Sequence, residues 1–225
     1  MALSKRLLAL YAMVKPGSVA ADIGCDHAQL AIALVQNGIC DHVYASDLRS
    51  SPLATAKQAV AQAGLNEQIT CTQCDGMDHL SSDVDTILIA GMGFETIHHI
   101  LTAHEEALYP SRRFIIQTNT HPEKLRRWIS DRHCTIEQED LVWEDHYYEV
   151  IAFHCGYHES YSEQECRFGV FLSDHPLREA YLRYRLDKVR IILDRLPNYH
   201  ERKTVLHSWE SDLCELLEPY DNSND

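Results

Sequence analysis

The chain is short of glycine and of positive charge, and each shortage excludes a class of ligand or partner. It has 9 glycines among 225 residues and a formal net charge of −14. In the first expected strand–turn–helix unit only Gly24 is present, whereas a dinucleotide site needs the pattern G-x-G-x-x-G to cradle a pyrophosphate. The acidic balance also counts against general affinity for nucleic acid, because phosphate contacts need Lys and Arg.

Long apolar runs are absent as well. No stretch of about 18 uncharged apolar residues occurs, so we expect no membrane span. The first residues carry charges but no apolar segment before a cleavage site, which argues against secretion and favours a cytoplasmic protein. With 45% hydrophobic and 24% charged residues, the composition is that of an ordinary globular protein.

Cysteine is not scarce, but its arrangement suits neither a metal site nor a disulfide framework. The 8 cysteines are scattered, several of them in apolar strand-like segments, which predicts buried free thiols in a reducing compartment. Cys71 and Cys74 have C-x-x-C spacing, yet in an expected strand their thiols point to opposite faces, and no second pair follows. We therefore expect no metal ion.

The most informative segment runs from Ala21 to His27 with the sequence A-D-I-G-C-D-H. It follows a short apolar run and precedes a helix-like segment, and Asp47 lies 25 positions after Asp22. This is the layout of a strand, a tight turn, a helix and a second strand whose final carboxylate accepts hydrogen bonds from ribose hydroxyls. Asp26 would repel a pyrophosphate. A ligand with a ribose and a positive centre but no phosphate fits better, and S-adenosylmethionine is such a ligand.

Strands and helices are expected to alternate over the first two thirds of the chain. The expected strands are residues 18–23, 43–46, 68–73, 84–90, 113–117, 135–142 and 147–154, and the expected helices are 3–13, 28–36, 52–63, a segment ending at 101, and 122–130. Short, fully apolar strands in this alternation indicate an α/β fold with a parallel sheet covered on both faces. With an antiparallel hairpin at the end, the arrangement is analogous to the seven-stranded, mostly parallel sheet of Rossmann-like class I methyltransferases.

The last third of the chain has a different pattern. Residues 156–172 are polar and expected to be irregular, and two later apolar stripes at helical spacing predict an α-helical hairpin broken at Pro197 and Asn198. We assign a catalytic domain to residues 1–155 and a C-terminal helical region to 156–225, with a frayed tail over 219–225. Residues 178–203 hold eight basic and four acidic side chains, which predicts either a basic patch for nucleic acid or an ordinary solvated helix face.

Further polar residues follow strands at the carboxyl edge, where open α/β sheets bind ligands. Asp22 and Gly24 are expected to wrap the methionine part of the cofactor, and Asp47 its ribose. Asp75 is placed to accept a hydrogen bond from the adenine amino group, and Gly91 lets the backbone approach the reacting methyl group. Each aspartate alone is more often a helix cap or a turn residue, but three in order at successive strand ends indicate a cofactor site.

Four motifs also look familiar: L-S-K-R-L from Leu3, A-D-I-G-C-D-H-A from Ala21, D-G at Asp75 and I-A-G-M-G from Ile89. They resemble those of the bacterial tRNA (adenine-22-N1)-methyltransferases, the TrmK family. The resemblance runs from the first helix to the last strand and continues into the C-terminal hairpin. It implies methylation of N1 of an adenine in the D-arm of tRNA, with S-adenosylmethionine as methyl donor and tRNA as partner.

Two positions depart from the family pattern, namely Phe94, where a glycine is usual, and Thr118, which replaces the proline of Q-P-N. Both border the expected target-base pocket. We expect cofactor binding by Asp22, Gly24, Asp47, Leu48, Asp75, Gly76, Ala90, Gly91 and Met92. We also expect substrate contacts by Arg6, Phe94, Arg183, Lys188 and Arg190, and catalytic roles for Asp26, His27 and Asn119.

The reaction needs little acid–base help. N1 of adenine carries a lone pair and can attack the methyl group directly, so catalysis can rest on in-line positioning and on negative charge near the developing cation. Asp26, oriented by His27, is the candidate for that charge, and capping of the following helix is the alternative. A base in folded RNA must be unstacked to react, and Phe94, Tyr147 and Tyr148 are candidate stacking platforms or else core residues.

Two alternative functions stay open at this point. The chain can be a methyltransferase that acts on another nucleic acid or on a small molecule, or a relative that binds cofactor or RNA without activity. The sequence does not determine the oligomeric state, and a monomer is favoured.

Overall fold

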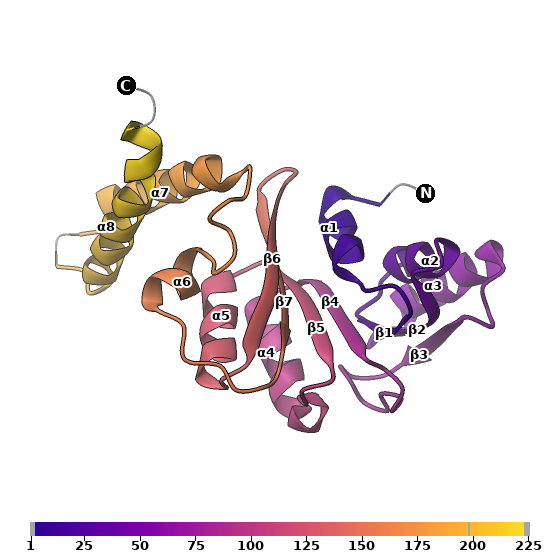
Figure 1. Ribbon diagram of the computed structural model, residues 1–225. Helices are drawn as coiled ribbons and strands as arrows, with labels where there is room; N and C mark the ends of the chain where they lie inside the picture. Colours follow the sequence, from indigo (N-terminus) through magenta and orange to yellow (C-terminus); the bar gives the residue numbers. More distant parts are fainter. Residues whose placement is uncertain (1–2, 198, 223–225) are drawn as a thin grey trace.

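The computed structural model describes residues 3–197 and 199–222. Its centre is a seven-stranded sheet with the order β3-β2-β1-β4-β5-β7-β6 (Figure 1). The strands are β1 (Ser18–Ile23), β2 (Cys40–Asp47), β3 (Ile69–Gln73), β4 (Thr86–Met92), β5 (Arg113–Thr118), β6 (Thr135–Trp143) and β7 (Tyr147–His154). β7 is antiparallel to both β5 and β6, and the other pairs are parallel. The strand order reverses between β1 and β4, which is where such sheets bind ligands.

Helices cover both faces of this sheet (Figure 1). On one face α1 (Lys5–Met13), α2 (Gln29–Gln36) and α3 (Ser50–Ala63) share a buried core with the strands. On the other face α4 (Phe94–Ala103) and α5 (Pro122–Asp131) form a second core, beside the short 3-10 turn η1 (Glu105–Ala107). Strand β5 is buried along its whole length, as an apolar strand between two helical layers should be. The expected fold class is confirmed.

A short helix, α6 (Glu163–Phe168), lies within the segment expected to be irregular, so that prediction is wrong. Ser162 and Glu165 form a reciprocal capping box at its start. Cys166 and Phe168 are buried against the rest of the protein. Capping and packing therefore stabilise a helix that is too short to show a helical period in the sequence.

The expected helical hairpin is present as α7 (Arg178–Arg195) and α8 (Arg202–Asp221). Fraying was expected from residue 219, but α8 includes Pro219 and ends at Asp221, so that prediction is wrong. Leu217 is buried and Tyr220 packs against the same apolar cluster, which holds the last turn of the helix in place. Residues 223–225 of the expected tail and Asn198 of the expected break lie outside the described residues.

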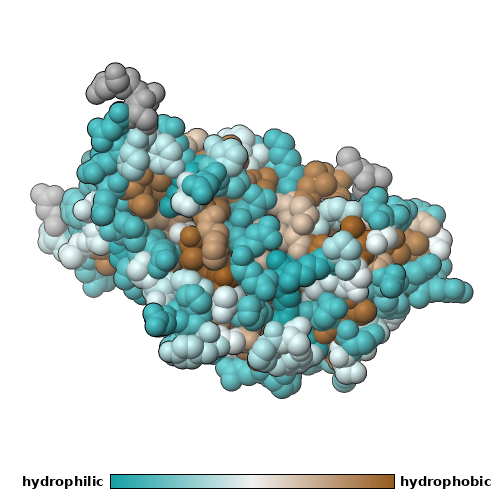
Figure 2. All heavy atoms as spheres, in the orientation of Figure 1, coloured by the Kyte–Doolittle hydropathy of each residue, from teal (hydrophilic) through white to brown (hydrophobic). Residues whose placement is uncertain are grey.

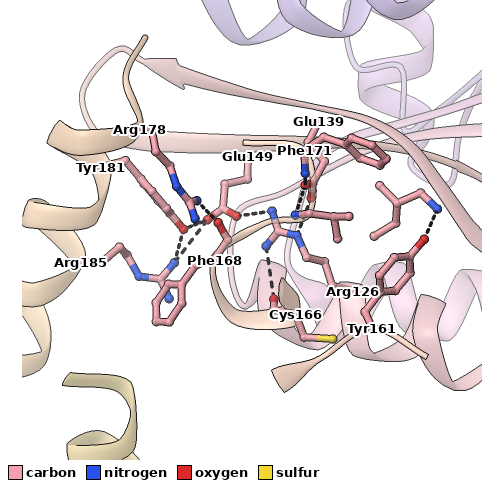
Figure 3. A network of polar contacts seen from close by, with 12 residues as sticks. Arg126, Glu139, Glu149, Tyr161, Cys166, Phe168, Phe171, Arg178, Tyr181 and Arg185 are labelled. Carbon is pink, nitrogen blue, oxygen red and sulfur yellow. Dashed lines mark hydrogen bonds and ion pairs between the residues drawn. The ribbon is translucent and has the colours of Figure 1, made fainter. Parts of the chain in front are cut away.

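A buried ionic network joins the C-terminal helices to the sheet (Figure 3). Arg126 of α5 is fully buried between Glu139 of β6 at 2.5 Å and Glu149 of β7 at 2.7 Å. Glu149 accepts a hydrogen bond from the Tyr181 hydroxyl of α7 at 2.7 Å and lies 3.3 Å from Arg185. Burial opposes the charge on Arg126, yet the two carboxylates hold its pKa above the ordinary value. The network ties α7 to the sheet, and the domain boundary at residue 155 stays a prediction.

Among the residues described, no helix combines the length and apolar character needed to cross a bilayer. All eight cysteines are free thiols. The same residues contain no group of three or more His, Cys, Asp or Glu side chains that could hold a metal ion. Figure 2 shows a largely hydrophilic face, with hydrophobic residues both between the C-terminal helices and the sheet and in the region of the N-terminal helices.

Candidate active site

An open pocket of about 810 Å³ lies at the carboxyl edge of the sheet, at the ends of β1, β2 and β4 and in the loop after β3. The start of α1 and one side of α4 complete its wall. This volume suits a small-molecule ligand. The wall contains every residue expected to bind the cofactor, two of the expected catalytic residues and one expected substrate contact: Arg6, Asp22, Gly24, Asp26, His27, Asp47, Leu48, Asp75, Gly76, Ala90, Gly91 and Met92.

Asp22 lies near the end of β1 and is only 5% exposed. Its carboxylate accepts a hydrogen bond from the backbone N–H of Ala31 in the first turn of α2, where N–H groups lack intrahelical partners. Burial raises the pKa of Asp22 to about 7, and the bond from Ala31 offsets only part of this rise. The pocket therefore holds a carboxyl group that changes charge near neutral pH, and a cationic ligand would favour its ionised form.

The turn that follows holds Asp26 and His27 at the pocket wall. The Asp26 carboxylate is 3.5 Å from His27 Nε2, and its side chain is 61% exposed. Helix α2 begins only at Gln29, its N-cap is Ala28, and no side chain caps it. The capping alternative for Asp26 is therefore wrong, because the backbone places that carboxylate before the cap position and toward the pocket.

Asp47 ends β2 and is 5% exposed. Its Oδ1 accepts a hydrogen bond from the Arg49 backbone N–H at 2.9 Å and lies 3.6 Å from Arg49 Nε. Within the described part of the chain, no hydrogen bond engages Oδ2 of Asp47. One oxygen of this carboxylate is thus held in place while the other can accept a bond from a ligand hydroxyl. Asp75, in the loop after β3, is exposed on the same wall.

A polar clamp built on Gln117 holds the ends of β4 and β5 together. Gln117 is fully buried, and its Oε1 accepts hydrogen bonds from Arg6 Nη1 at 2.8 Å and from the Gly91 N–H at 2.9 Å. Its Nε2 donates to Asn119 Oδ1 at 3.1 Å, while Asn119 Nδ2 donates to the Gly91 carbonyl at 2.7 Å. Gly91 has φ +77°, and a Cβ there would lie 3.0 Å from Arg6 Nη1. In the sequence Gln117 is only a polar residue at the end of the expected strand 113–117, which does not reveal its partners.

Phe94 and Asn119 are not among the described residues that line the pocket. Phe94 is 8% exposed and belongs to the core under α4, so the core-packing alternative describes it. The side chain of Asn119 forms its hydrogen bonds with Gln117 and with the Gly91 carbonyl. Its catalytic role stays a prediction. Of the other candidate platforms, Tyr148 lies beside Arg6, with 5.7 Å from the guanidinium carbon to the ring centroid, whereas Tyr147 faces α7.

The basic residues of the C-terminal helices lie away from the pocket wall, and several are neutralised. Arg183 forms ion pairs with Glu179 and Asp221, and Arg190 with Glu210. Contact of Arg183, Lys188 and Arg190 with RNA stays a prediction. Arg178 is buried and donates to the Phe168 carbonyl, and Arg185 lies against Glu149, so neither adds to a basic surface patch.

Apart from Arg6, sequence reasoning missed the residues that α1 and α4 supply to the wall. Ser4 and Leu7 come from the start of α1, and Thr96, His99 and Ile100 from α4. These residues do not follow a strand, so the rule that ligands bind at strand ends does not find them. Only the packing of α1 and α4 over the edge of the sheet brings them to the pocket.

Comparison with known proteins agrees with this geometry. A family model described as a methyltransferase domain matches residues 3–151. A Bacillus subtilis protein named tRNA (adenine(22)-N(1))-methyltransferase is 36% identical over 156 residues, which are 68% of this chain and 66% of that protein. This match therefore spans slightly less than two thirds of the relative's length.

Solved structures resemble the chain over nearly its whole length. TrmK of M. capricolum, in complex with S-adenosyl-homocysteine, has a TM-score of 0.85 at 28% identity, covering 96% of this chain and 98% of its own. A Streptococcus pneumoniae protein in complex with S-adenosyl-L-methionine has a TM-score of 0.87 at 29% identity, covering 96% of this chain and all of its own. The resemblance seen in the motifs is confirmed, and the chain belongs to the methyltransferase family whose domain model spans residues 3–151.

Proposed function

We propose that the pocket binds S-adenosylmethionine and that the protein transfers its methyl group to N1 of adenine 22 in the D-arm of tRNA. The observation that carries this proposal is the meeting of two buried carboxylates, Asp22 and Asp47, with the backbone of Gly91 in one pocket wall. The names of similar proteins support it, since the B. subtilis relative is a tRNA (adenine(22)-N(1))-methyltransferase. The compartment would be the cytoplasm, where tRNA is available.

The residues present fit this cofactor. The open oxygen of Asp47 can accept from a ribose hydroxyl, and Asp22 offers negative charge to the cationic methionine part. Gly24 has φ +73°, which glycine adopts without strain, and a Cβ there would also displace the flexible end of Met92, 2.1 Å away, so glycine suits the turn on that side of the pocket. A phosphate group would meet Asp26 instead of a glycine-rich cradle.

The cofactor supplies an electrophilic methyl group when it is bound. The clamp fixes the backbone of Gly91 in the pocket wall, and such a fixed wall would help to hold donor and acceptor in position. Asp26 places negative charge where the adenine becomes cationic, and His27 lies within 3.5 Å to orient it. Residues 1–155 would perform the chemistry, and residues 156–225 would help to hold the tRNA.

Titration calorimetry with S-adenosylmethionine, followed by a methyl-transfer assay on bulk tRNA, separates the candidate functions. Binding together with transfer to tRNA supports the proposal. Binding with transfer only to another acceptor favours a different substrate, and binding with no transfer favours an inactive relative. Absence of binding to a folded protein contradicts the cofactor assignment.

A further inference from the structure

Three aromatic side chains meet where the β6–β7 hairpin contacts α7. The ring centroids of Trp143 and Tyr147 are 4.7 Å apart, and Tyr184 of α7 lies 5.2 Å from Tyr147 and 6.3 Å from Trp143. Trp143 is 42% exposed, whereas Trp128 in the core is 5% exposed. The three rings thus contact one another, and Trp143 presents aromatic surface to solvent.

This aromatic cluster lies at the same edge of the sheet as the pocket. β6 runs parallel to β5, so Trp143 at its carboxyl end lies at the ligand-binding edge. Lys5 at the start of α1 donates from Nζ to the Trp143 carbonyl at 3.2 Å. The next residue, Arg6, lines the pocket. Two consecutive residues of α1 therefore reach the two places: Lys5 contacts Trp143, and Arg6 lines the pocket.

One face of α7 continues the aromatic cluster with positive charge. Tyr184, Lys188, Ile191 and Arg195 follow at intervals of four, three and four, which places them on one side of the helix. Lys188 Nζ is 5.3 Å from the Tyr184 ring centroid. In the part of the chain that the structure describes, neither Lys188 nor Arg195 forms an ion pair with a carboxylate.

The neighbouring flank of the same helix differs in charge. It carries Arg183, Asp187, Arg190 and Asp194 at helical spacing, so cations and acids alternate there. Both arginines of this flank are also engaged by Glu179, Glu210 or Asp221. The face that begins at Tyr184 is therefore the one that offers unpaired positive charge next to aromatic rings.

We propose that the surface formed by Trp143, Tyr147, Tyr184, Lys188 and Arg195 binds the tRNA beside the target adenine, and that a neighbouring unstacked nucleotide stacks on Trp143. This inference rests on the proposed function. Extruding an adenine from folded RNA also disturbs the stacking of its neighbours. Aromatic rings receive such bases because every base has a π face, and cations in line with them contact the phosphates.

Tryptophan fluorescence tests the contact directly. We expect an unmodified tRNA transcript to quench the emission of the wild-type protein, and we expect that quenching to disappear in Trp143→Phe. The chain has 3 tryptophans, and the Phe variant removes only the signal at position 143. Binding of the transcript is measured separately by anisotropy. If the transcript binds but no quenching depends on Trp143, the inference is overturned.

Affinity for the transcript distinguishes stacking from mere packing. Trp143→Leu keeps an apolar side chain but loses the flat ring, so we expect the Kd for tRNA to rise by about 5- to 150-fold, the range for one stacked base. Trp143→Phe should stay within about threefold of wild type, because a ring is retained. Equal affinity of the Leu and Phe variants would indicate packing only and overturn the inference.

Two controls keep this result separate from the proposed function and from misfolding. Tyr157 is 85% exposed and stacks only on His133 among the ring contacts described, so Tyr157→Leu should leave the Kd for tRNA unchanged. The calorimetric affinity for S-adenosylmethionine should be the same in all variants. Quenching of Trp143 by a transcript that is never methylated would contradict the proposed function and support this surface. Methylation of the transcript without quenching of Trp143 would support the proposed function and overturn this surface.

Discussion

The turn after β1 holds two residues other than glycine in the left-handed region, Asp26 at φ +48° and Ala28 at φ +54°. Such a conformation costs about 1–2 kcal/mol for a residue with a Cβ, and it persists where the surroundings fix it. Here the backbone N–H groups of Gly24 and Cys25 both donate to the Ser46 carbonyl at 2.8 Å. The turn is fastened to the end of β2, which keeps Asp26 at the pocket.

Asp26→Asn tests whether the charge of this residue acts in the reaction. Asparagine also adopts the left-handed conformation readily, so the fold of the turn should survive. If the carboxylate stabilises the forming cation, turnover should fall by roughly 10²-fold with little change in binding. Single-turnover methylation with both ligands saturating measures this, and a rate near wild type would remove Asp26 from the catalytic residues.

The raised pKa of Asp22 predicts how cofactor binding depends on pH. In the free protein this carboxyl takes up a proton as the pH falls through about 7, and the neutral form attracts a cationic ligand less. Affinity for S-adenosylmethionine should therefore weaken between pH 8 and pH 5.5. Calorimetry on Asp22→Asn should show weaker binding at pH 8 and a flat profile, and identical pH profiles for both proteins would contradict the assignment.

The raised pKa of Asp22 also determines how the stability of the folded protein changes with pH. The folded state binds this proton below about pH 7, whereas an unfolded aspartate binds it only below about 4. Burial of ionised Asp22 therefore lowers the stability of the free protein at high pH, and that loss is regained progressively as the pH falls from about 7 to about 4. A cationic ligand would compensate for the same charge.

At the residue scale, strand-end carboxylates could be predicted from the sequence and the clamp could not. Asp22, Asp47 and Asp75 each lie at or just after the carboxyl end of a strand, so their convergence follows from the topology alone. The role of Gln117 depends on three separate partners, Arg6, Gly91 and Asn119, which meet only after the sheet has formed. Tertiary contacts of this kind leave no periodic signal in the sequence.

Among the elements, the junction between the sheet and α7 rests on charge buried with its partners. Burial works against the charge of Glu149, but Arg126 and Arg185 hold its pKa below the ordinary value. A lowered carboxyl pKa stabilises the fold above the unfolded pKa of about 4.3, and this contribution is lost as the pH falls through the folded value. The junction between α7 and the sheet should therefore weaken only below about pH 4.3.

Glu149→Gln should lower the free energy of unfolding by about 3–5 kcal/mol, because it leaves buried Arg126 with one carboxylate instead of two. Urea denaturation measures the change. Glu163→Gln is the matched control, since its pair with Arg127 is exposed on both sides and such pairs contribute about 1 kcal/mol or less. Equal effects of the two substitutions would show that burial of the network adds nothing.

The two flanks of α7 should differ in their effect on RNA binding. Replacing Lys188 and Arg195 with Ala should weaken tRNA binding and reduce the slope of log affinity against log salt by about two, one for each phosphate contact. Replacing Arg183 and Arg190 should have a smaller effect, because acids already neutralise them. A larger effect of the second pair, measured across a salt series, would assign the RNA to the neighbouring flank that carries Arg183 and Arg190.

Elements with a long apolar period were predictable, and short or proline-containing ones were not. The stripes of α7 and α8 indicated the hairpin, since Leu182, Leu186 and Leu193 are all buried as expected. Helix α6 depends on a capping box and two buried side chains, and the end of α8 on packing that outweighs Pro219. In both cases tertiary contacts decide over local propensity.

For the whole molecule, the proposed function requires a protein with a formal charge of −14 to bind a polyanion. In that proposal the acids of the pocket serve a cationic cofactor, whereas the surface formed by Trp143, Tyr147, Tyr184, Lys188 and Arg195 is aromatic and cationic. The acidic pocket and the cationic, aromatic surface would be separate. An acidic overall composition is therefore compatible with a tRNA substrate. It also predicts weak binding to nucleic acid in general, since only a local surface attracts phosphates.

Mapping the methylated nucleoside tests the proposed activity most directly. The protein is incubated with S-adenosylmethionine and an unmodified tRNA transcript that carries adenine at position 22, and the digested RNA is analysed by mass spectrometry. We expect 1-methyladenosine at that position and no methylation of a matched transcript with guanine there. A methyl group at another site, or none on tRNA despite measurable cofactor binding, would contradict the assignment of this chain as a tRNA adenine-N1 methyltransferase.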